Sequence, residues 1–317
     1  MRQSRFEILF GQGHRILQDS PELKFMRLIT NEQPEAAAAL FADSRFHGEG
    51  LPGIETPYGS FHGQQAILEM ARGWYSVFNA KRAVLVPVTQ TQAGSRSVTE
   101  FVLHYTTEDN ADHAVPMAAV GELGNTKMLD ALRLYYNWQM VPDTPPYRPP
   151  VFLPKPDLTT RTEMLSGAIY DYFKYLHDPN GAIVTHASQV FADRACFGGY
   201  ERKDQNDAFG PFPREDFVRS VMEPISARLS RHIRLRMETI IDDGKICCVE
   251  WEQLVTKAGR EELQRLSQPG IAFYERDDTG RIWSVRVIDY AGSEQFIDWD
   301  KACISREAAE QLNYIGK

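Results

Sequence analysis

The chain has 317 residues, of which 35 are basic and 43 acidic, so its formal net charge at pH 7 is −8. Charged residues make up 25% and hydrophobic residues 43%, as in an ordinary globular protein rather than a disordered or fibrous one. The acidic balance argues against a nucleic-acid binder with a general basic surface, and no apolar run approaches the roughly 20 residues that span a bilayer.

The N-terminus does not resemble a secretion signal. Residues 1–17 contain several charged side chains and no long apolar core. The four cysteines are too few for a disulfide scaffold, and no C-x-x-C pair is present. We therefore expect a soluble, cytoplasmic protein with no membrane partner and no nucleic-acid partner.

The first half of the chain predicts helices followed by strands. Four consecutive alanines favour a helix over 34–41, and an irregular segment rich in Gly and aromatic residues follows. The remaining elements expected in this half are a helix over 64–78 and strands over 83–91, 97–105, 115–122 and 128–138.

A proline-rich stretch then interrupts the pattern. Residues 141–150 hold five prolines, and Pro154 and Pro156 follow. Proline removes a backbone donor and restricts the residue before it, so an extended, fairly stiff linker is expected. We predict a first domain at 1–141, a linker at 142–157 and a second domain at 158–317.

The second half repeats the first. Phe41-Ala42-Asp43 recurs 150 residues later as Phe191-Ala192-Asp193, and Glu100-Phe101 matches Glu250-Trp251 at the same spacing. Helices are expected over 163–177 and 214–229, and strands over 233–241, 246–255, 271–276 and 282–290. Matches in one order at nearly one spacing predict a duplicated unit of about 150 residues. The closing strands repeat at a spacing of 153, as Leu129-x-x-Leu132-Arg133 and Ile282-x-x-Val285-Arg286.

Helices followed by a meander of strands predict an α+β fold. Its motifs include the Phe-Ala-Asp sequence, Tyr58-Gly59-x-x-x-Gly63 before a helix, and Val249-Glu250-Trp251 in a central strand. The closing strands, 270–276 and 280–289, add the best match. With these motifs the chain resembles the NTF2-like superfamily, and within it the polyketide-cyclase-like (SnoaL-like) branch. The resemblance implies two tandem cone-shaped half-barrels, each a curved, mostly antiparallel sheet wrapped around helices.

The resemblance also implies a range of functions. The family includes isomerases, dehydratases, cyclases and epoxide hydrolases, and binding proteins without chemistry. We expect a cofactor-independent lyase, isomerase, cyclase or hydrolase that acts by general acid–base chemistry on a small, mostly apolar or aromatic molecule with a carbonyl or hydroxyl. The alternatives are a non-catalytic module for a small molecule or protein, and cones filled by their own aromatic side chains. Paired sheets in the family imply a pseudo-dimer within the chain, and a further homodimer stays open.

Acid–base chemistry in such a cone requires a carboxylate, His or Tyr whose pKa is shifted by burial. Asp289 ends an apolar strand where the family often carries an acidic residue, and is our candidate general base, against the alternative of a turn cap. Aligning the two arginines of the closing strands places Tyr136 opposite Asp289, and aligning on the family pattern places Asn137 there. Neither is a base, so we expect the second unit to be the active one, with a Tyr or His as hydrogen-bond donor. Tyr136 is kept as a candidate catalytic residue. Glu250 and His104 are further candidates, although Glu250 lies on the more polar face of its strand and fits an exposed or interface position equally.

A basic cluster includes Arg234 and Arg236 on one strand face. We interpret it as a solvated sheet face that pairs with Glu250 and Glu252 of the next strand, with a carboxylate-binding patch as the alternative. The histidines show no metal-binding spacing, and neither a P-loop nor a Gly-x-Gly-x-x-Gly motif occurs, so no metal and no cofactor is expected.

Overall fold

The computed structural model describes residues 19–41, 53–56, 59–124, 127–136, 141, 151–152, 164–178, 180–198, 211–256 and 263–289. The chain divides into two compact units, here called unit 1, mainly residues 1–153, and unit 2, mainly residues 154–287. The division falls within the proline-rich stretch.

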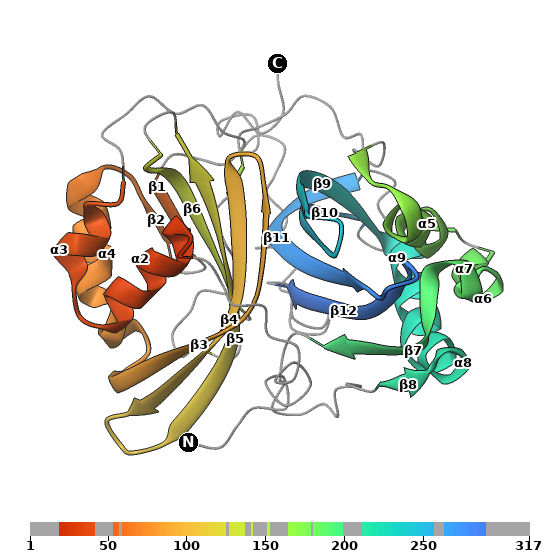
Figure 1. Cartoon of the computed structure of the whole chain (residues 1–317), viewed down its shortest axis with the longest axis horizontal. Coiled ribbons are helices and arrows are strands. Elements are labelled where there is room, and N and C mark those ends of the chain that lie inside the picture. Colours follow the sequence, from red (N-terminus) through yellow and green to blue (C-terminus); the bar gives the residue numbers. More distant parts are fainter. Residues whose placement is uncertain are drawn as a thin grey trace. The chain divides into compact units, whose positions relative to one another are not determined.

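Unit 1 packs its helices against one face of a six-stranded sheet (Figure 1). The strand order is β2-β1-β6-β5-β4-β3, and β1 and β6 are the parallel neighbours. The helices are α2 (Pro21–Thr30), α3 (Pro34–Ala38) and α4 (Gln64–Val77), and the strands are β1 (Gly53–Thr56), β2 (Gly59–Phe61), β3 (Ala80–Ala93), β4 (Arg96–Thr107), β5 (Asp112–Leu123) and β6 (Leu129–Tyr136).

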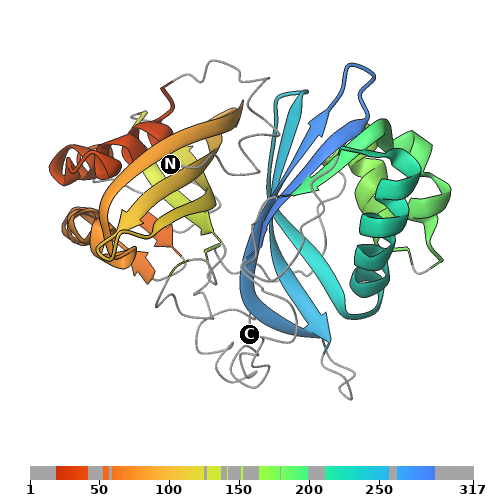
Figure 2. The same ribbon diagram turned by 90° about the horizontal axis from the view of Figure 1, so that it is seen from below.

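Unit 2 repeats this topology with the order β8-β7-β12-β11-β10-β9 and a parallel pair of β7 and β12. Its helices again gather on one face of the sheet (Figure 2). The helical elements are α5 (Gly167–Leu176), α6 (Ala182–Thr185), α7 (Ala187–Val190), α8 (Arg214–Phe217), the π-helix η3 (Val218–Met222) and α9 (Glu223–His232). The strands are β7 (Phe191–Gly198), β8 (Phe212–Pro213), β9 (Ile233–Asp242), β10 (Ile246–Thr256), β11 (Leu263–Arg276) and β12 (Ile282–Asp289). The predicted α+β fold in two tandem halves is confirmed.

Local sequence explains the helix that the prediction lacked. The side chain of Ser20 caps α2 by accepting from the backbone N–H of Leu23, and Pro21 occupies the first turn, where a missing N–H costs nothing. Phe25, Met26 and Ile29 then follow at helical spacing and are buried. The predicted helix over 34–41 is the shorter α3, which ends at Ala38.

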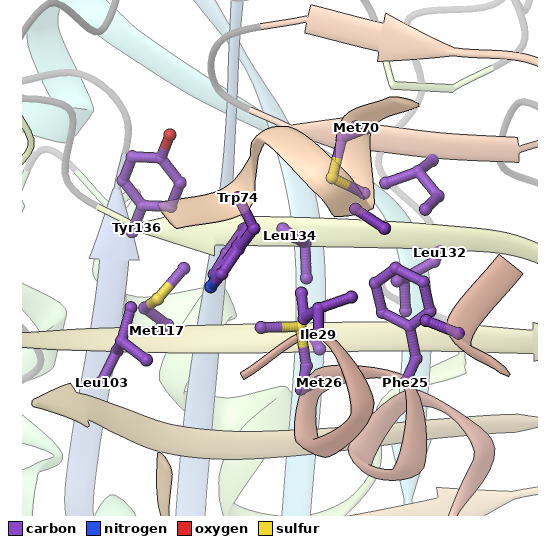
Figure 3. Close-up of a cluster of buried hydrophobic side chains, with 14 of the residues drawn as sticks. Phe25, Met26, Ile29, Met70, Trp74, Leu103, Met117, Leu132, Leu134 and Tyr136 are labelled. Atoms are coloured by element: carbon purple, nitrogen blue, oxygen red, sulfur yellow. The ribbon is translucent and has the colours of Figure 1, made fainter. Parts of the chain in front are cut away.

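Strand alternation gives each sheet a helix-facing side. In β4, Phe101, Leu103 and Tyr105 belong to the hydrophobic core formed with α2 and α4. Figure 3 shows this core, with side chains of α2 and α4 meeting those of β4, β5 and β6. The intervening residues of β4, including Glu100 and His104, therefore lie on the opposite face, and both are buried.

Both units place the same ion pair on the face away from the helices. In unit 1, Arg133 Nη2 lies 2.9 Å from Glu122 Oε1. In unit 2, Arg286 Nη1 lies 3.0 Å from Glu275 Oε2. Each residue of the first pair precedes its counterpart by 153 positions, the spacing of the sequence repeat. The duplication read from the sequence is thus present in three dimensions.

Candidate functional site

An aromatic cluster in the interior of unit 1 forms the candidate site. Four positions on one face of α4 are buried, and the last of them is Trp74. The Trp74 and Phe78 rings lie 4.8 Å apart between centroids. Phe78 in turn contacts Tyr105 of β4 at 5.3 Å and Tyr136 of β6 at 6.1 Å. The end of α4 thus brings aromatic side chains from two strands around one ring.

Two hydrogen-bond donors in this cluster are buried without a partner among the described residues. They are the indole N–H of Trp74 and the hydroxyl of Tyr105. Both side chains are at most 1% exposed. Burial raises the pKa of Tyr105 to about 12, so its hydroxyl stays protonated at neutral pH. The interior therefore offers two neutral donors in apolar surroundings.

His113 connects this cluster to the surface. It is the cross-strand partner of Tyr105 in the β4–β5 hairpin, and its ring stacks on the Tyr105 ring at 4.8 Å and 15°. His113 is half-buried, whereas Tyr105 is fully buried. A titratable imidazole thus lies beside a buried phenol on the helix-facing side of the sheet.

The structure describes the side chains of three of the four predicted site residues. Tyr136 lies in the aromatic cluster of unit 1. His104 lies on the opposite face of its sheet, and so does Glu250, because its neighbours Val249 and Trp251 take the other side of β10. Asp289 ends β12 as Tyr136 ends β6, but the Asp289 side chain lies outside the described residues.

The solvated interpretation of the basic strand face is wrong at Arg236. This side chain is 1% exposed and pairs with Glu238 and with Glu252, whose Oε2 lies 2.8 Å from Arg236 Nη2. The predicted cross-strand pairing with Glu252 is present. The predicted exposure to solvent is wrong, because this face of the sheet is buried as well. The side chain of Arg234 lies outside the described residues.

A second polar group in unit 1 was missed by the sequence analysis. Glu22, in the first turn of α2, is fully buried and accepts hydrogen bonds from Ser20, Ser97 and Thr99. Desolvation raises the pKa of its carboxyl above the usual 4.5, although the three hydroxyls oppose this. The three donors are the reason why the carboxyl is tolerated there, and they tie α2 to β4.

This burial predicts a specific pH dependence of stability. Because the folded-state pKa of Glu22 is raised, its contribution is fully present below the unfolded pKa of 4.5 and is lost as pH rises through the folded pKa. We expect Glu22→Gln to remove this falling limb, whose slope is at most about 1.4 kcal/mol per pH unit for one proton. Urea denaturation across a pH series measures it. The control is Glu35→Gln, since Glu35 is exposed and its pKa is lowered, mainly by its hydrogen bond with Arg72. This control should keep the falling limb. An unchanged limb in Glu22→Gln contradicts the prediction.

In unit 2, several polar side chains hydrogen-bond to one another. Tyr172 of α5 and Tyr274 of β11 are hydrogen-bonded to each other, and burial raises the pKa of both phenols. Nearby, the Cys247 thiol is hydrogen-bonded to Asp242, and burial raises its pKa too. Arg276 binds both carboxylate oxygens of Asp242 at 2.8 and 2.7 Å. The buried thiol is therefore protonated and unsuited to nucleophilic chemistry.

The described residues contain neither a metal-binding cluster nor a membrane-spanning helix. No three His, Cys, Asp or Glu side chains in this part of the chain come together as ligands for a metal ion. Nor does any helix in the same residues have the length and apolarity needed to cross a membrane.

No protein-family model matches the sequence, and no curated protein does. Solved structures do match. A protein from Catenulispora acidiphila with a ketosteroid isomerase-like fold, in complex with trimethylamine, is 15% identical, covers 40% of this chain and 93% of its own, and has a TM-score of 0.34. The epoxide hydrolase/cyclase-like enzyme SalBIII, of pyran ring formation in salinomycin, is 14% identical over 37% of this chain and 88% of its own, with a TM-score of 0.30.

An NTF2-like protein of unknown function from Exiguobacterium is 10% identical over 37% of this chain and 95% of its own, with a TM-score of 0.30. Each match covers about the length of one unit. The fold itself rests on the two sheets described above.

Proposed function

We propose that the interior of unit 1 binds a small, mostly apolar molecule that carries a carbonyl or hydroxyl oxygen. The observation that carries this proposal is the pair of buried donors, Trp74 N–H and Tyr105 O–H, that have no partner among the described residues. A buried donor without a partner costs about 1–3 kcal/mol. A ligand oxygen that accepts from either group recovers this free energy, and the surrounding rings supply apolar contact.

The same residues support general acid–base chemistry without a cofactor. When a proton leaves the carbon beside a carbonyl, negative charge develops on the carbonyl oxygen. Tyr105 and Trp74 are neutral donors that stabilise such an oxyanion. The proton passes to His113, since imidazole is the side chain most often used for proton transfer, and returns to the substrate at the same or another position. Because the proton taken from the substrate is returned to it, the net reaction is an isomerisation or a hydrogen exchange.

Binding is tested with two ligands of similar shape, 2-acetonaphthone and 2-ethylnaphthalene. We expect the ketone to bind about tenfold more tightly, which corresponds to one hydrogen bond of about 1.4 kcal/mol. The measurement is tryptophan fluorescence or calorimetry. The Tyr105→Phe variant should weaken this preference. Equal affinities would show that no buried donor binds the ketone oxygen, and no binding of either compound would show that the interior is filled by its own side chains. Either result overturns the proposal.

Chemistry is tested separately from binding. Exchange of the methyl protons of 2-acetonaphthone in D2O, followed by NMR, reports proton abstraction directly. We expect His113→Gln to slow this exchange about a hundredfold, within the usual range for a general base, while the affinity stays the same. Tight binding without exchange would leave the non-catalytic binding module as the function.

The unpaired hydroxyl also makes a stability prediction. In the absence of ligand, Tyr105→Phe removes a buried polar group that has no partner among the described residues, so we expect the free energy of unfolding to stay equal or rise by about 1 kcal/mol. Tyr172→Phe breaks the hydrogen bond to Tyr274 and should lower the free energy of unfolding by about 1 kcal/mol. Urea denaturation measures both. A loss in Tyr105→Phe as large as that in Tyr172→Phe would show that the Tyr105 hydroxyl has a partner.

A further inference from the structure

A groove on unit 2 lies apart from the sites described above. Its volume is about 370 Å³, within the range of small-molecule sites. One wall is the continuous helical stretch of α8, η3 and α9, and the other is formed by α6 and α7. Residues of both walls line it, so the groove is a product of the tertiary fold and not of one helix.

The charges in the groove are the first clue to its ligand. Arg214 is occupied, because its Nη1 donates to the backbone oxygen of Phe191 and pairs with Asp193, each at 3.1 Å. The exposed side chains of Glu215, Arg219 and Glu223 form no hydrogen bond or ion pair with any described residue. Among the described residues, the groove lining therefore includes one cation and two carboxylates that are not paired.

A π-helix interrupts the wall that carries these side chains. Residues 218–222 form η3, whose hydrogen bonds span five residues instead of four, and Arg219 lies within it. Glu215 and Arg219 are four residues apart, a spacing that allows an ion pair on a helix, yet the two do not pair. Single π-turns inside α-helices are frequent at functional sites.

The apolar part of the groove adds a second constraint. Val184 of α6 is 43% exposed, and Val218 lies in the facing wall. A ligand that fills the groove needs a short aliphatic section between its charged groups, as the stem of a lysine side chain provides.

We propose that this groove binds a free basic amino acid of the length of lysine. Its carboxylate pairs with the Arg219 guanidinium, a fork that matches carboxylate geometry. Its two ammonium groups pair with Glu215 and Glu223, and its methylene chain lies along Val184. The ligand carries one negative and two positive charges, the complement of Arg219, Glu215 and Glu223.

Lysine analogues that each lack one group test the proposal. L-Norleucine lacks the side-chain ammonium, and cadaverine lacks the carboxylate. In calorimetric titrations of the full chain, we expect L-lysine to bind at least about tenfold more tightly than either analogue. No saturation by L-lysine up to roughly 10 mM, or equal affinity for all three compounds, would overturn the proposal.

Variants assign the charged contacts. Arg219→Gln should weaken lysine about tenfold and leave cadaverine unchanged, whereas Glu215→Gln combined with Glu223→Gln should weaken both. The matched control is Arg72→Gln on the exposed face of α4, which should change nothing. All these side chains are exposed, so the variants should fold, as unchanged thermal melting will show. Lysine binding that is unaffected by Arg219→Gln overturns the assignment. Tyr105→Phe should leave lysine binding intact, so this site and the unit 1 interior fail or succeed independently.

Discussion

Replacing Arg236 with Met should lower the free energy of unfolding by about 3–5 kcal/mol, the usual cost of breaking a buried ion pair. Arg236 contacts two glutamates, Glu238 and Glu252, and all three side chains are at most 1% exposed. Without the guanidinium, two carboxylates stay buried beside each other in a region of low dielectric. Urea denaturation of the variant measures the loss, and a chain that fails to fold agrees with it.

A compensated variant keeps this prediction falsifiable. Replacing Glu238 and Glu252 with Leu and Met in the Arg236→Met background removes all three charges, and we expect it to recover most of the lost stability. Arg27→Met, which breaks an exposed pair with Asp19, is the control and should cost within about 0.5 kcal/mol. If Arg236→Met costs no more than Arg27→Met, the buried cluster does not stabilise the sheet.

The second large effect is expected at Gly270 of β11. A Cβ atom there would lie 2.6 Å from the ring of Trp251, which is far closer than a van der Waals contact. Trp251 is 3% exposed, so its ring lies in the close-packed interior. We expect Gly270→Ala to cost about 1–3 kcal/mol by overpacking, measured by urea denaturation.

A double-mutant cycle identifies the cause of this loss. In the Trp251→Leu background the clash is absent, so Gly270→Ala should cost much less than it does in the natural chain. Gly244→Ala is unsuitable as a control, because its φ of 87° would add backbone strain. Gly73→Ala, on α4 with its nearest neighbouring atom at 3.8 Å, is the matched control and should be neutral or stabilising. An equal loss in both backgrounds would show that Trp251 is not the cause.

Much of the fold could be predicted because the duplication leaves side-chain matches in the sequence. The two closing arginines, Arg133 and Arg286, fall on the equivalent strands β6 and β12 and form equivalent ion pairs. Alternation also identified the apolar side of β10, where Val249 and Trp251 lie. It failed for Glu250, because alternation distinguishes a solvated face from a buried one, and here both faces are buried.

The candidate site was harder to predict, since it depends on strand register. The sequence places the start of the strand at Val115, whereas β5 begins at Asp112. That difference of three residues hides His113, which pairs with Tyr105 only when both strands extend to the hairpin. Unpaired donors such as the Trp74 N–H have no signature in sequence, because the lack of a partner is a property of the packed interior.

At one strand position the two units carry residues that cannot replace each other. Gly121 precedes Glu122 in unit 1, and Tyr274 precedes the equivalent Glu275 in unit 2. A Cβ atom at Gly121 would lie 3.2 Å from Glu22 Oε2 and 3.0 Å from Leu129 Cδ2, so no tyrosine fits where the buried carboxyl lies. Copying β11 over β5 would therefore bring a tyrosine against the buried Glu22 carboxyl, so we expect such an exchange to destabilise unit 1. The two units share one topology, but their equivalent strands can no longer replace each other.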